Sequence, residues 1–530
     1  MIILYNKTVV YYNTLVYLKP RQIIFYIYYY IRNQIVKRTR VKLQNTDIQS
    51  RNLSVITNTT YRQYYSDNQF SFLNKDHYFD NQINWNNVKH GKLWNYNLNY
   101  FDYLLQPNVS KEDGKCLIDQ YIAAIKYCKY GLDPYPTSIR CINWIIFISL
   151  HKIEDPVIDG ALLSQYRYLM KNIEYHISGN HLLENACSLL FGAYYFQDKN
   201  LYKKADRILK NELDDQILPD GAHYELSPMY HRIVLNRLMD CINLMSNNSY
   251  PGSEDLFHLI KSKTIKMIGW IEALTYTNGK TPRFNDSADD IAPSLYEIHD
   301  YADRLKIPRP KTIALKESGY RKFKNSRYEC IVDYGIPSPA HQPGHSHCDI
   351  FSFELYVDHL PVIVDTGTST YEEFERRHTE RSTRSHNTVQ IGSYEQAEIW
   401  SYFRIGRRPK VYNFEDTSDF ISCSHDGFKN GKYQHKRSFR FRSNDIKIFD
   451  EISPKPMIPA YAYLHFHPDQ NVKLMGPFIS AGDNVQITVD GASNIRLEEY
   501  QYAHGFNKLQ TAVCAVITFY SEIVTTVVIK

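Results

Sequence analysis

Three short stretches of this sequence concentrate residues that could carry chemistry. In residues 179–186 (GNHLLENA), Asn180 and Glu184 lie one helical turn apart, as do His181 and Asn185. An N-cap after a helix-breaking glycine accounts for Asn180 and in part for Glu184. It does not account for His181 with Asn185. The stretch therefore predicts a group of polar side chains at the start of a helix.

The second stretch is residues 218–232 (LPDGAHYELSPMYHR). Ser227 is an expected N-cap and Pro228 an expected first-turn residue, which places Tyr230 and His231 in the first turn of a helix. The positive end of a helix favours a phenolate, so we expect a lowered pKa for Tyr230. The alternative is a plain core tyrosine, because the chain has 45 Tyr residues.

The third stretch is residues 344–349 (GHSHCD), directly before an expected strand. His347, Asp365 and His386 are separated by 18 and 21 residues, which brings three strand ends together. Two imidazoles and a carboxylate suit zinc, and a hydrogen-bonded His/Asp network fits the same spacing. Alternate side chains of an extended HxH point the same way, so His347 could bind metal while His345 faces a cleft.

The elements that position these residues change character along the chain. From about 86 to 306, apolar residues recur at spacings of three and four, which predicts helices and a helical bundle, solenoid or toroid. The expected helices span 118–129, 137–150, 162–177, 182–196 and 228–245. From 307 to 530 the pattern has period two, which predicts an antiparallel β-sandwich. The expected strands span 351–357, 361–364, 388–391, 438–441, 446–449 and 517–529. The predicted fold class is thus multidomain α+β.

Residues 1–85 read as a leader with helical character. Its apolar core, residues 23–31, is too short to span a membrane, and no signal-peptide cleavage site follows it. We therefore expect a cytoplasmic protein, with a periplasmic or exported location left open. A basic run follows at residues 37–42. The favoured interpretation is an amphipathic helix packed on the body, and weak contact with an anionic membrane surface is the alternative.

Composition narrows the function class only slightly. The net charge of +5 permits an anionic ligand and gives no sign of a nucleic-acid-binding tail. Nine dispersed Cys residues without a CxxC pair indicate buried thiols in a reducing compartment. Abundant tyrosine suits a sugar-binding cleft, since a ring can stack on a pyranose while its hydroxyl hydrogen-bonds.

Several stretches together resemble the heparinase II/III family of polysaccharide lyases and the alginate lyases of the same architecture. They cover roughly residues 85–410 in the family's order: HGKLWNYNLNYFDYL (90–104), GNHLLENA, LPDGAHYELSPMYH, GHSHCDIFSFEL, VIVDTG and RSHNTV. The resemblance implies an (α/α) toroid over 86–306, a β-sandwich over 307–530 and a cleft between them. It also implies zinc at His347, Asp365 and His386, and no organic cofactor.

The same resemblance implies β-elimination on an acidic polysaccharide. Asn180 and His181 would neutralise the substrate carboxylate. Tyr230 would pass a proton to the glycosidic oxygen or act as base, and His345 is the alternative base. The expected further substrate contacts are Glu184, Asn185 and His231.

Two other functions remain open from the sequence. A glycoside hydrolase on the same scaffold would need two carboxylates, for which Glu184, Glu225 and Asp286 are candidates. A polysaccharide-binding or assembly protein would need no catalysis. Heparan sulfate, alginate and a bacterial capsule or exopolysaccharide all fit as the glycan. The missing signal peptide favours a polysaccharide of the producing cell, and neither the oligomeric state nor the endo or exo mode is indicated.

Overall fold

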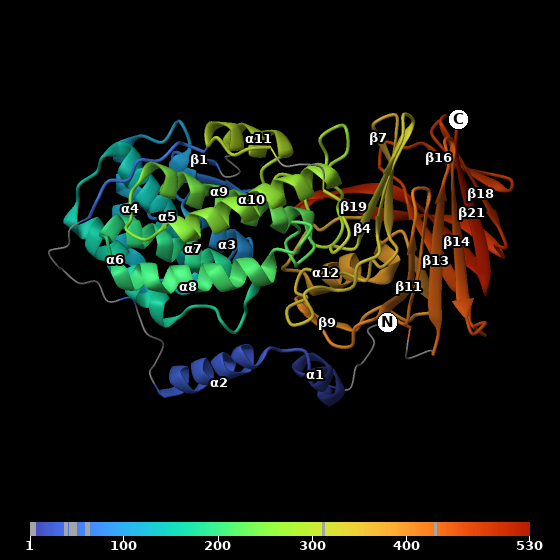
Figure 1. Cartoon of the computed structure of the whole chain (residues 1–530), viewed down its shortest axis with the longest axis horizontal. Helices are drawn as coiled ribbons and strands as arrows, with labels where there is room; N and C mark the ends of the chain where they lie inside the picture. The colour runs from blue at the N-terminus through green and yellow to red at the C-terminus, as the bar shows by residue number, and fades with distance from the viewer. Residues whose placement is uncertain (1–6, 36–40, 42–49, 59–63, 310–312, 429–431) are drawn as a thin grey trace.

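The computed structural model describes residues 7–35, 41, 50–58, 64–309, 313–428 and 432–530. In these residues a helical domain is followed by antiparallel β-sheets, and two leader helices run along one side of the molecule (Figure 1). The predicted order, helices first and antiparallel strands second, is confirmed.

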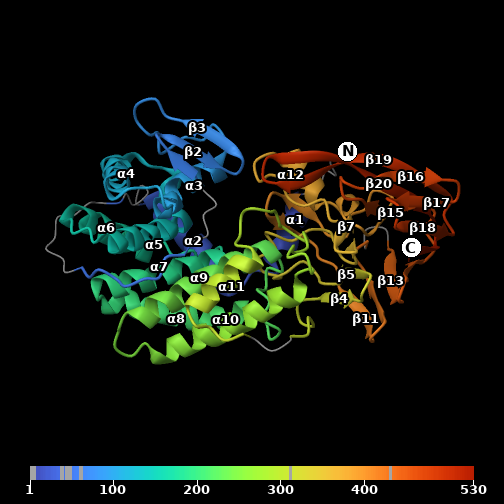
Figure 2. The same ribbon diagram turned by 90° about the horizontal axis from the view of Figure 1, so that it is seen from above.

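The helical domain has two layers, as in an (α/α) toroid. The inner helices are α3 (Lys92–Tyr100), α5 (Pro134–His151), α7 (Gly179–Phe196) and α9 (Pro228–Asn247). Each inner helix packs against the next. The outer helices are α4 (Lys111–Ala124), α6 (Pro156–Lys171), α8 (Lys199–Gln216) and α10 (Glu254–Leu274), and α11 (Leu295–Arg304) lies against α9 and α10. The chain thus alternates between layers (Figure 2).

Burial explains which helices lie inside. Every residue of α7 is buried except His181, so this helix is covered on all sides, as a central helix must be. The outer helix α8 instead buries a single stripe that includes Leu201, Ala205, Leu209 and Leu213. His181 is therefore the one residue of α7 that stays partly exposed.

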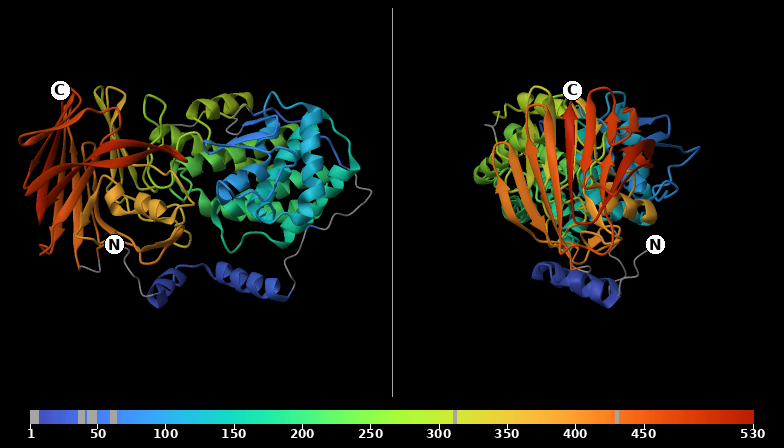
Figure 3. Two further views of the ribbon diagram at one scale, coloured as in Figure 1. Left: turned by 180° about the vertical axis from the view of Figure 1, so that it is seen from behind. Right: turned by 90° about the vertical axis from the view of Figure 1, so that its right-hand side faces the viewer.

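Besides a two-stranded hairpin, the described part of the β-domain contains three antiparallel sheets. The first has the order β4-β5-β6-β7: β4 (Tyr320–Lys324), β5 (Tyr328–Asp333), β6 (Phe353–Val357), β7 (Leu360–Ile363). The second is β19-β20-β15-β8: β19 (Asn494–Gly505), β20 (Lys508–Phe519), β15 (Ala460–His465), β8 (Val389–Ile391). The third, seen from the side in Figure 3, has the order β11-β12-β13-β14-β21-β18-β17-β16: β11 (Val411–Asp416), β12 (Phe420–His425), β13 (Gln434–Phe441), β14 (Asp445–Ser453), β21 (Glu522–Ile529), β18 (Val485–Asp490), β17 (Phe478–Ala481), β16 (Val472–Met475).

These sheets share one hydrophobic core, which makes the arrangement a sandwich. Phe353 of the first sheet, Ile517 of the second and Ile448 of the third belong to the same buried cluster. Alternate residues of β14 are buried, as the period-two pattern requires. A hairpin of β9 (Ile399–Ser401) with β10 (Arg404–Ile405) and the helix α12 (Phe374–Arg381) face the helical domain.

The leader differs from its prediction. It holds two helices, α1 (Lys7–Leu15) and α2 (Pro20–Ile35), and then an antiparallel meander of β1 (Tyr64–Ser66), β2 (Gln69–Phe72) and β3 (Lys75–Tyr78). The meander was missed because its strands are very short. Its turns take positive φ angles at Asp67-Asn68 and Leu73-Asn74. No helix in the described residues is long and apolar enough to cross a membrane.

Several predicted boundaries also shift. The helix predicted at 162–177 is α6, which begins and ends six residues earlier. The strand predicted at 517–529 is in fact the end of β20 and all of β21, separated by a turn at Tyr520-Ser521. Ser227 caps α9 as predicted, because its side chain accepts a hydrogen bond from the Tyr230 N–H at 3.1 Å.

Candidate active site

A cleft of about 1060 Å³ lies between the helical domain and the β-domain. The inner helices α3, α5, α7 and α9 line one side of it. The other side comes from the β-domain: His345, Tyr371 and the β9–β10 turn at residues 401–404. Five of the predicted site residues line this cleft: Asn180, His181, Glu184, Tyr230 and His345.

Tyr230 and His345 form a stacked pair across the two domains. Their ring centroids are 3.7 Å apart, with 26° between the planes. The Tyr230 hydroxyl lies 3.2 Å from that of Tyr371. His345 Nδ1 lies 2.8 Å from an oxygen of Asp286, whereas Nε2 is 3.8 Å from Glu225, beyond hydrogen-bond reach. A hydrogen bond from Nδ1–H to Asp286 leaves Nε2 as the basic nitrogen.

The pKa of Tyr230 shifts opposite to the prediction. Burial raises it well above its ordinary value, and the nearby charge of Asp286 raises it further. Arg377 and the Tyr371 hydrogen bond oppose this rise without reversing it. Tyr230 is therefore a protonated phenol in the free protein, which makes it a proton donor rather than a ready base.

Asp286 holds the β-domain side of the site together. Its carboxylate pairs with both Arg377 guanidinium nitrogens, with His345, and with His347 Nε2 at 2.9 Å. Burial alone would raise the pKa of Asp286, but Arg377 and the two imidazole hydrogen bonds hold it well below its usual range. The sequence suggests Asp286 only as a carboxylate of a hydrolase, and no motif marks Arg377, which lies 91 residues away.

A strained turn sets the start of α7. Ser178 and Gly179 both have positive φ, 67° and 62°, and a Cβ on Gly179 would lie 2.3 Å from Glu225 Oε1. Asn180 does not cap the helix as predicted. Its backbone N–H and side-chain amide both donate to Glu225, at 3.0 and 2.8 Å. Burial opposes ionisation of Glu225, yet His223, His345 and these donors lower its pKa.

His181 lines the cleft, and its surroundings favour the protonated form of its ring. Its Nδ1 lies 3.1 Å from Glu174, and the Tyr135 ring packs on it at 4.3 Å between centroids. Burial would lower the pKa of His181, but the Glu174 carboxylate outweighs burial and raises it. Glu184, one turn further along α7, pairs with Arg237 at 2.7 Å.

Two predicted substrate contacts have structural positions instead. Asn185 is fully buried. Its side-chain oxygen accepts a hydrogen bond from the Glu174 backbone N–H, and its side-chain nitrogen donates to the Glu174 carboxylate. His231 is buried too, with Nε2 2.9 Å from the Met267 carbonyl and Nδ1 accepting the His223 N–H. Burial lowers the pKa of His231 to about 3. Neither side chain lines the cleft, so the structure does not place Asn185 or His231 where the predicted substrate contacts would be.

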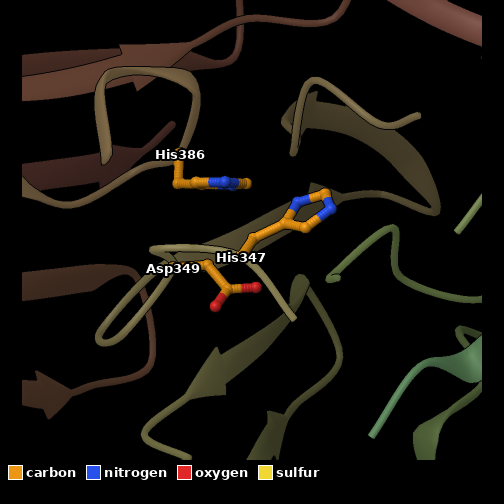
Figure 4. A group of neighbouring side chains, drawn as sticks. All are labelled: His347, Asp349 and His386. Atoms are coloured by element: carbon orange, nitrogen blue, oxygen red, sulfur yellow. The ribbon is translucent and has the colours of Figure 1, made fainter. Parts of the chain in front are cut away.

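The metal candidates lie behind the cleft. His347, Asp349 and His386 each offer a ligand atom, all within 4.8 Å of one another (Figure 4). His347 Nδ1 and His386 Nε2 are buried without a hydrogen-bond partner, as expected of nitrogens kept for a cation. Burial raises the pKa of Asp349 to about 6, which a bound cation would reverse. These residues fit a metal.

Asp365 is placed differently from the prediction. Its carboxylate lies 2.7 Å from His386 Nδ1, on the ring nitrogen away from the cluster. Asp286 occupies the matching position on His347. Carboxylates in such positions orient metal-binding imidazoles and fix their tautomers. Asp349 therefore replaces Asp365 in the cluster, a change that the spacing of residues in the sequence could not indicate.

Comparison with known proteins identifies the family. The family model Heparinase II/III N-terminus matches residues 150–306, and Heparinase II/III-like, C-terminal, matches residues 307–528. Among curated proteins, the chain is similar to a heparin-sulfate lyase from Bacteroides stercoris, at 24% identity over 310 residues. That match covers 52% of this chain and 44% of the relative, so the chain aligns with less than half of the relative's length.

Solved structures share the fold. Heparinase III matches with a TM-score of 0.69 at 16% identity, covering 96% of this chain and 91% of that one. A heparan sulfate lyase from Pedobacter heparinus gives 0.54 at 16% identity, covering 87% and 81%. A chondroitin AC lyase from Streptomyces coelicolor A3 gives 0.51 at 9% identity, covering 83% and 74%.

The buried ion pair of Asp286 generates a stability prediction. Asp286→Asn leaves Arg377, which is 1% exposed, without its carboxylate, and we expect unfolding to become easier by about 3–5 kcal/mol. Asp303→Asn is the matched control, because it breaks an exposed Asp–Arg pair and should cost ~1 kcal/mol or less. Chemical denaturation measures both, and equal effects would contradict the role given to Asp286.

The stability difference between wild type and Asp286→Asn depends on pH, because the folded-state pKa of Asp286 is lowered. A carboxylate with a depressed folded-state pKa stabilises the protein above its unfolded-state pKa of about 3.9. That contribution is lost as the pH falls through the folded-state value. The gap between wild type and Asp286→Asn should therefore be full above about pH 5 and shrink below about pH 4.

Proposed function

The chain belongs to the heparinase II/III-like family, and from that premise we propose that it is a lyase that cleaves a uronate-containing polysaccharide by β-elimination. The observation that carries the proposal is the Tyr230–His345 pair in the interdomain cleft, with Asp286 behind the imidazole. A base and a proton donor stand side by side there, as elimination requires.

Elimination makes three demands on the site. The C5 proton of a uronate must be removed, the charge growing on its carboxylate must be stabilised, and the leaving O4 must be protonated. His345 is the base in this proposal, because Asp286 fixes its tautomer and leaves Nε2 to accept the C5 proton. Tyr230 donates its phenolic proton to O4, in keeping with its raised pKa.

His181 and Asn180 stabilise the substrate carboxylate. His181 is the one partly exposed residue of α7, and Glu174 favours its cationic form. Asn180 is held in place by Glu225 at the same helix end, whose positive dipole favours an anion. Donors fixed in this way before the reaction contribute typically about 3 kcal/mol each to transition-state stabilisation.

The charges that line the cleft support a lightly charged substrate. Among the described residues three Lys and Arg side chains line it, and each has a partner: Lys92 with Asp133, Arg237 with Glu184 and Asp240, and Arg404 with the Tyr26 hydroxyl. The lining carboxylates are more numerous: Asp102, Asp133, Glu174, Glu184, Glu225, Asp240, Asp290 and Glu372. We therefore favour an unsulfated acidic glycan, such as a capsule or exopolysaccharide, over a sulfated one.

The hydrolase alternative has weaker support. The pKa values of Glu225 and Asp286 are lowered, and the carboxylates bond to Asn180 and Arg377, so neither is a ready general acid. Burial raises the pKa of Glu184, but Arg237 pairs with it. A hydrolase needs two carboxylates in separate roles across the glycosidic bond.

Zinc is the cation that we propose for the buried cluster. His347, Asp349 and His386 would hold it, with Asp286 and Asp365 orienting the two imidazoles. Bound there, zinc would contribute folding free energy as a structural ion. The role of the protein groups is to keep His347 and the neighbouring His345 in fixed orientations.

Tyr230→Phe tests the proton donor. The variant keeps the ring that stacks on His345, so we expect nearly unchanged stability and a fall in turnover of at least ~100-fold. Turnover is followed by the ultraviolet absorbance of the unsaturated product. Near-full rates in the variant would remove Tyr230 from the mechanism.

Tyr224→Phe is the matched control for that experiment. The Tyr224 hydroxyl accepts the Gly179 N–H at 3.1 Å and does not line the cleft. Its loss leaves a buried donor unpaired, so we expect a stability loss of about 1–3 kcal/mol with a much smaller effect on turnover.

A matched substrate pair tests both the reaction and the charge argument. The same uronate–glucosamine backbone is offered in an unsulfated and a sulfated form. We expect kcat/KM for the unsulfated form to be at least ~10-fold higher, because the carboxylates that line the cleft would repel the sulfate groups of the sulfated form. New reducing ends without ultraviolet absorbance would indicate a hydrolase. Binding without any cleavage of the preferred polymer would indicate a non-catalytic protein.

Metal analysis tests the zinc proposal. We expect about one zinc per chain in purified protein, and loss of zinc with a lower Tm in His386→Ala. Asp349→Asn should release zinc more readily than Asp365→Asn, because only Asp349 belongs to the cluster. Metal-free wild-type protein with unchanged stability would contradict the proposal.

A further inference from the structure

The helices α1 and α2 form a strap, residues 7–35, along one edge of the molecule (Figures 1 and 3). Its contacts reach both domains. Thr14 accepts a hydrogen bond from the Trp400 indole of the β-domain, and Tyr29 donates to the Ile173 carbonyl of the helical domain. The Arg21–Glu212 ion pair adds a contact to α8.

Only a few side chains of the strap are buried. The buried side chains in its two helices are Val10, Thr14, Gln22 and Tyr29. Of these, Gln22 and Thr14 are polar and are held by hydrogen bonds. The strap therefore docks on the body mainly through specific polar and aromatic contacts, and its apolar residues are left for another surface.

The outward face of the strap is strongly apolar. Of the 32 exposed large hydrophobic side chains in the described part of the chain, 13 belong to residues 9–35. In α2 they follow helical spacing, so that Ile24, Ile27, Tyr28, Ile31 and Ile35 form one stripe, each at least half exposed. An amphipathic helix packed on a protein buries such a stripe, and this one points away from the body.

Charge identifies the kind of surface that this face fits. Residues 1–46 contain eight Lys and Arg and no Asp or Glu. Lys19, Arg21 and Arg32 bond to the helical domain, and the other five are Lys7 and four residues between 37 and 42. An apolar stripe accompanied by cations alone is the pattern of a helix that lies in the interface of an anionic membrane.

We propose that the strap docks this protein on an anionic lipid membrane, with the outward stripe of α2 inserted among the lipid headgroups. This goes beyond the interpretation favoured from the sequence, in which the leader packs its apolar side on the body. Neither helix needs to cross the bilayer. The strap also carries Tyr26, which lines the cleft, so docking would hold the cleft beside the membrane surface.

The test is co-sedimentation of the full chain with vesicles. We expect binding to vesicles of phosphatidylglycerol and phosphatidylcholine, weaker binding at high salt, and little binding to phosphatidylcholine alone. Ile24→Glu combined with Ile27→Glu should lower binding at least ~10-fold, because both side chains would enter the apolar interface. These residues are 62% and 55% exposed, so folding should persist, as thermal melting would check.

Leu360→Glu combined with Met457→Glu is the matched control. These side chains are 64% and 96% exposed in the β-domain, and their replacement should leave vesicle binding unchanged. Ile35→Glu, at a 75% exposed position, is a second strap variant should the double variant fold poorly. The proposal is overturned if the wild-type protein binds neither kind of vesicle, or if the strap and control variants bind vesicles equally well. It is also overturned if the strap stripe mediates self-association without lipid binding.

Discussion

The site depends on one buried carboxylate. Asp286 lies in the loop between α10 and α11, yet its partners Arg377, His345 and His347 all belong to the β-domain. A carboxylate without exposure to water is stable as an anion only with partners of this kind. The same interactions orient the proposed base and one metal-binding imidazole. Asp286 thus carries the buried charge, links the two domains and orients the proposed base.

The helical domain supplies the groups that we propose for binding the substrate carboxylate. The left-handed turn at Ser178-Gly179 brings the start of α7 against Glu225, where a larger residue than glycine would clash. That turn places Asn180 and His181 at the cleft. Asn185 and Glu174 then support His181 from behind. The stretch that carries the family resemblance thus lies at the end of α7 that faces the cleft.

Much of this arrangement could be predicted from local sequence. The helices and strands follow apolar periodicity, and the Ser227 cap follows from residue type. The stretches around Asn180, Tyr230 and His345 were found because each groups several polar residues within a few positions. All three reach the cleft.

What escaped prediction depends on distant contacts. Arg377 is one arginine among many until the fold sets it against Asp286. Asp349 takes the place in the cluster that was predicted for Asp365, which instead lies against Nδ1 of His386. The Tyr230 pKa moved upward because burial outweighs the helix dipole, and burial is a property of the whole fold. Asn185 and His231 look available in sequence and are enclosed in the structure.

The stacked rings of Tyr230 and His345 have a further consequence, because the two residues come from different domains. The proposed acid and base thus meet at a contact between the domains, so any opening of the cleft would separate them. The open cleft that would admit a long polymer is therefore not the closed arrangement that the proposed reaction needs. A bound sugar that touches both walls would favour the closed arrangement by mass action. Catalytic competence is then a property of the closed population of molecules, rather than of either domain alone.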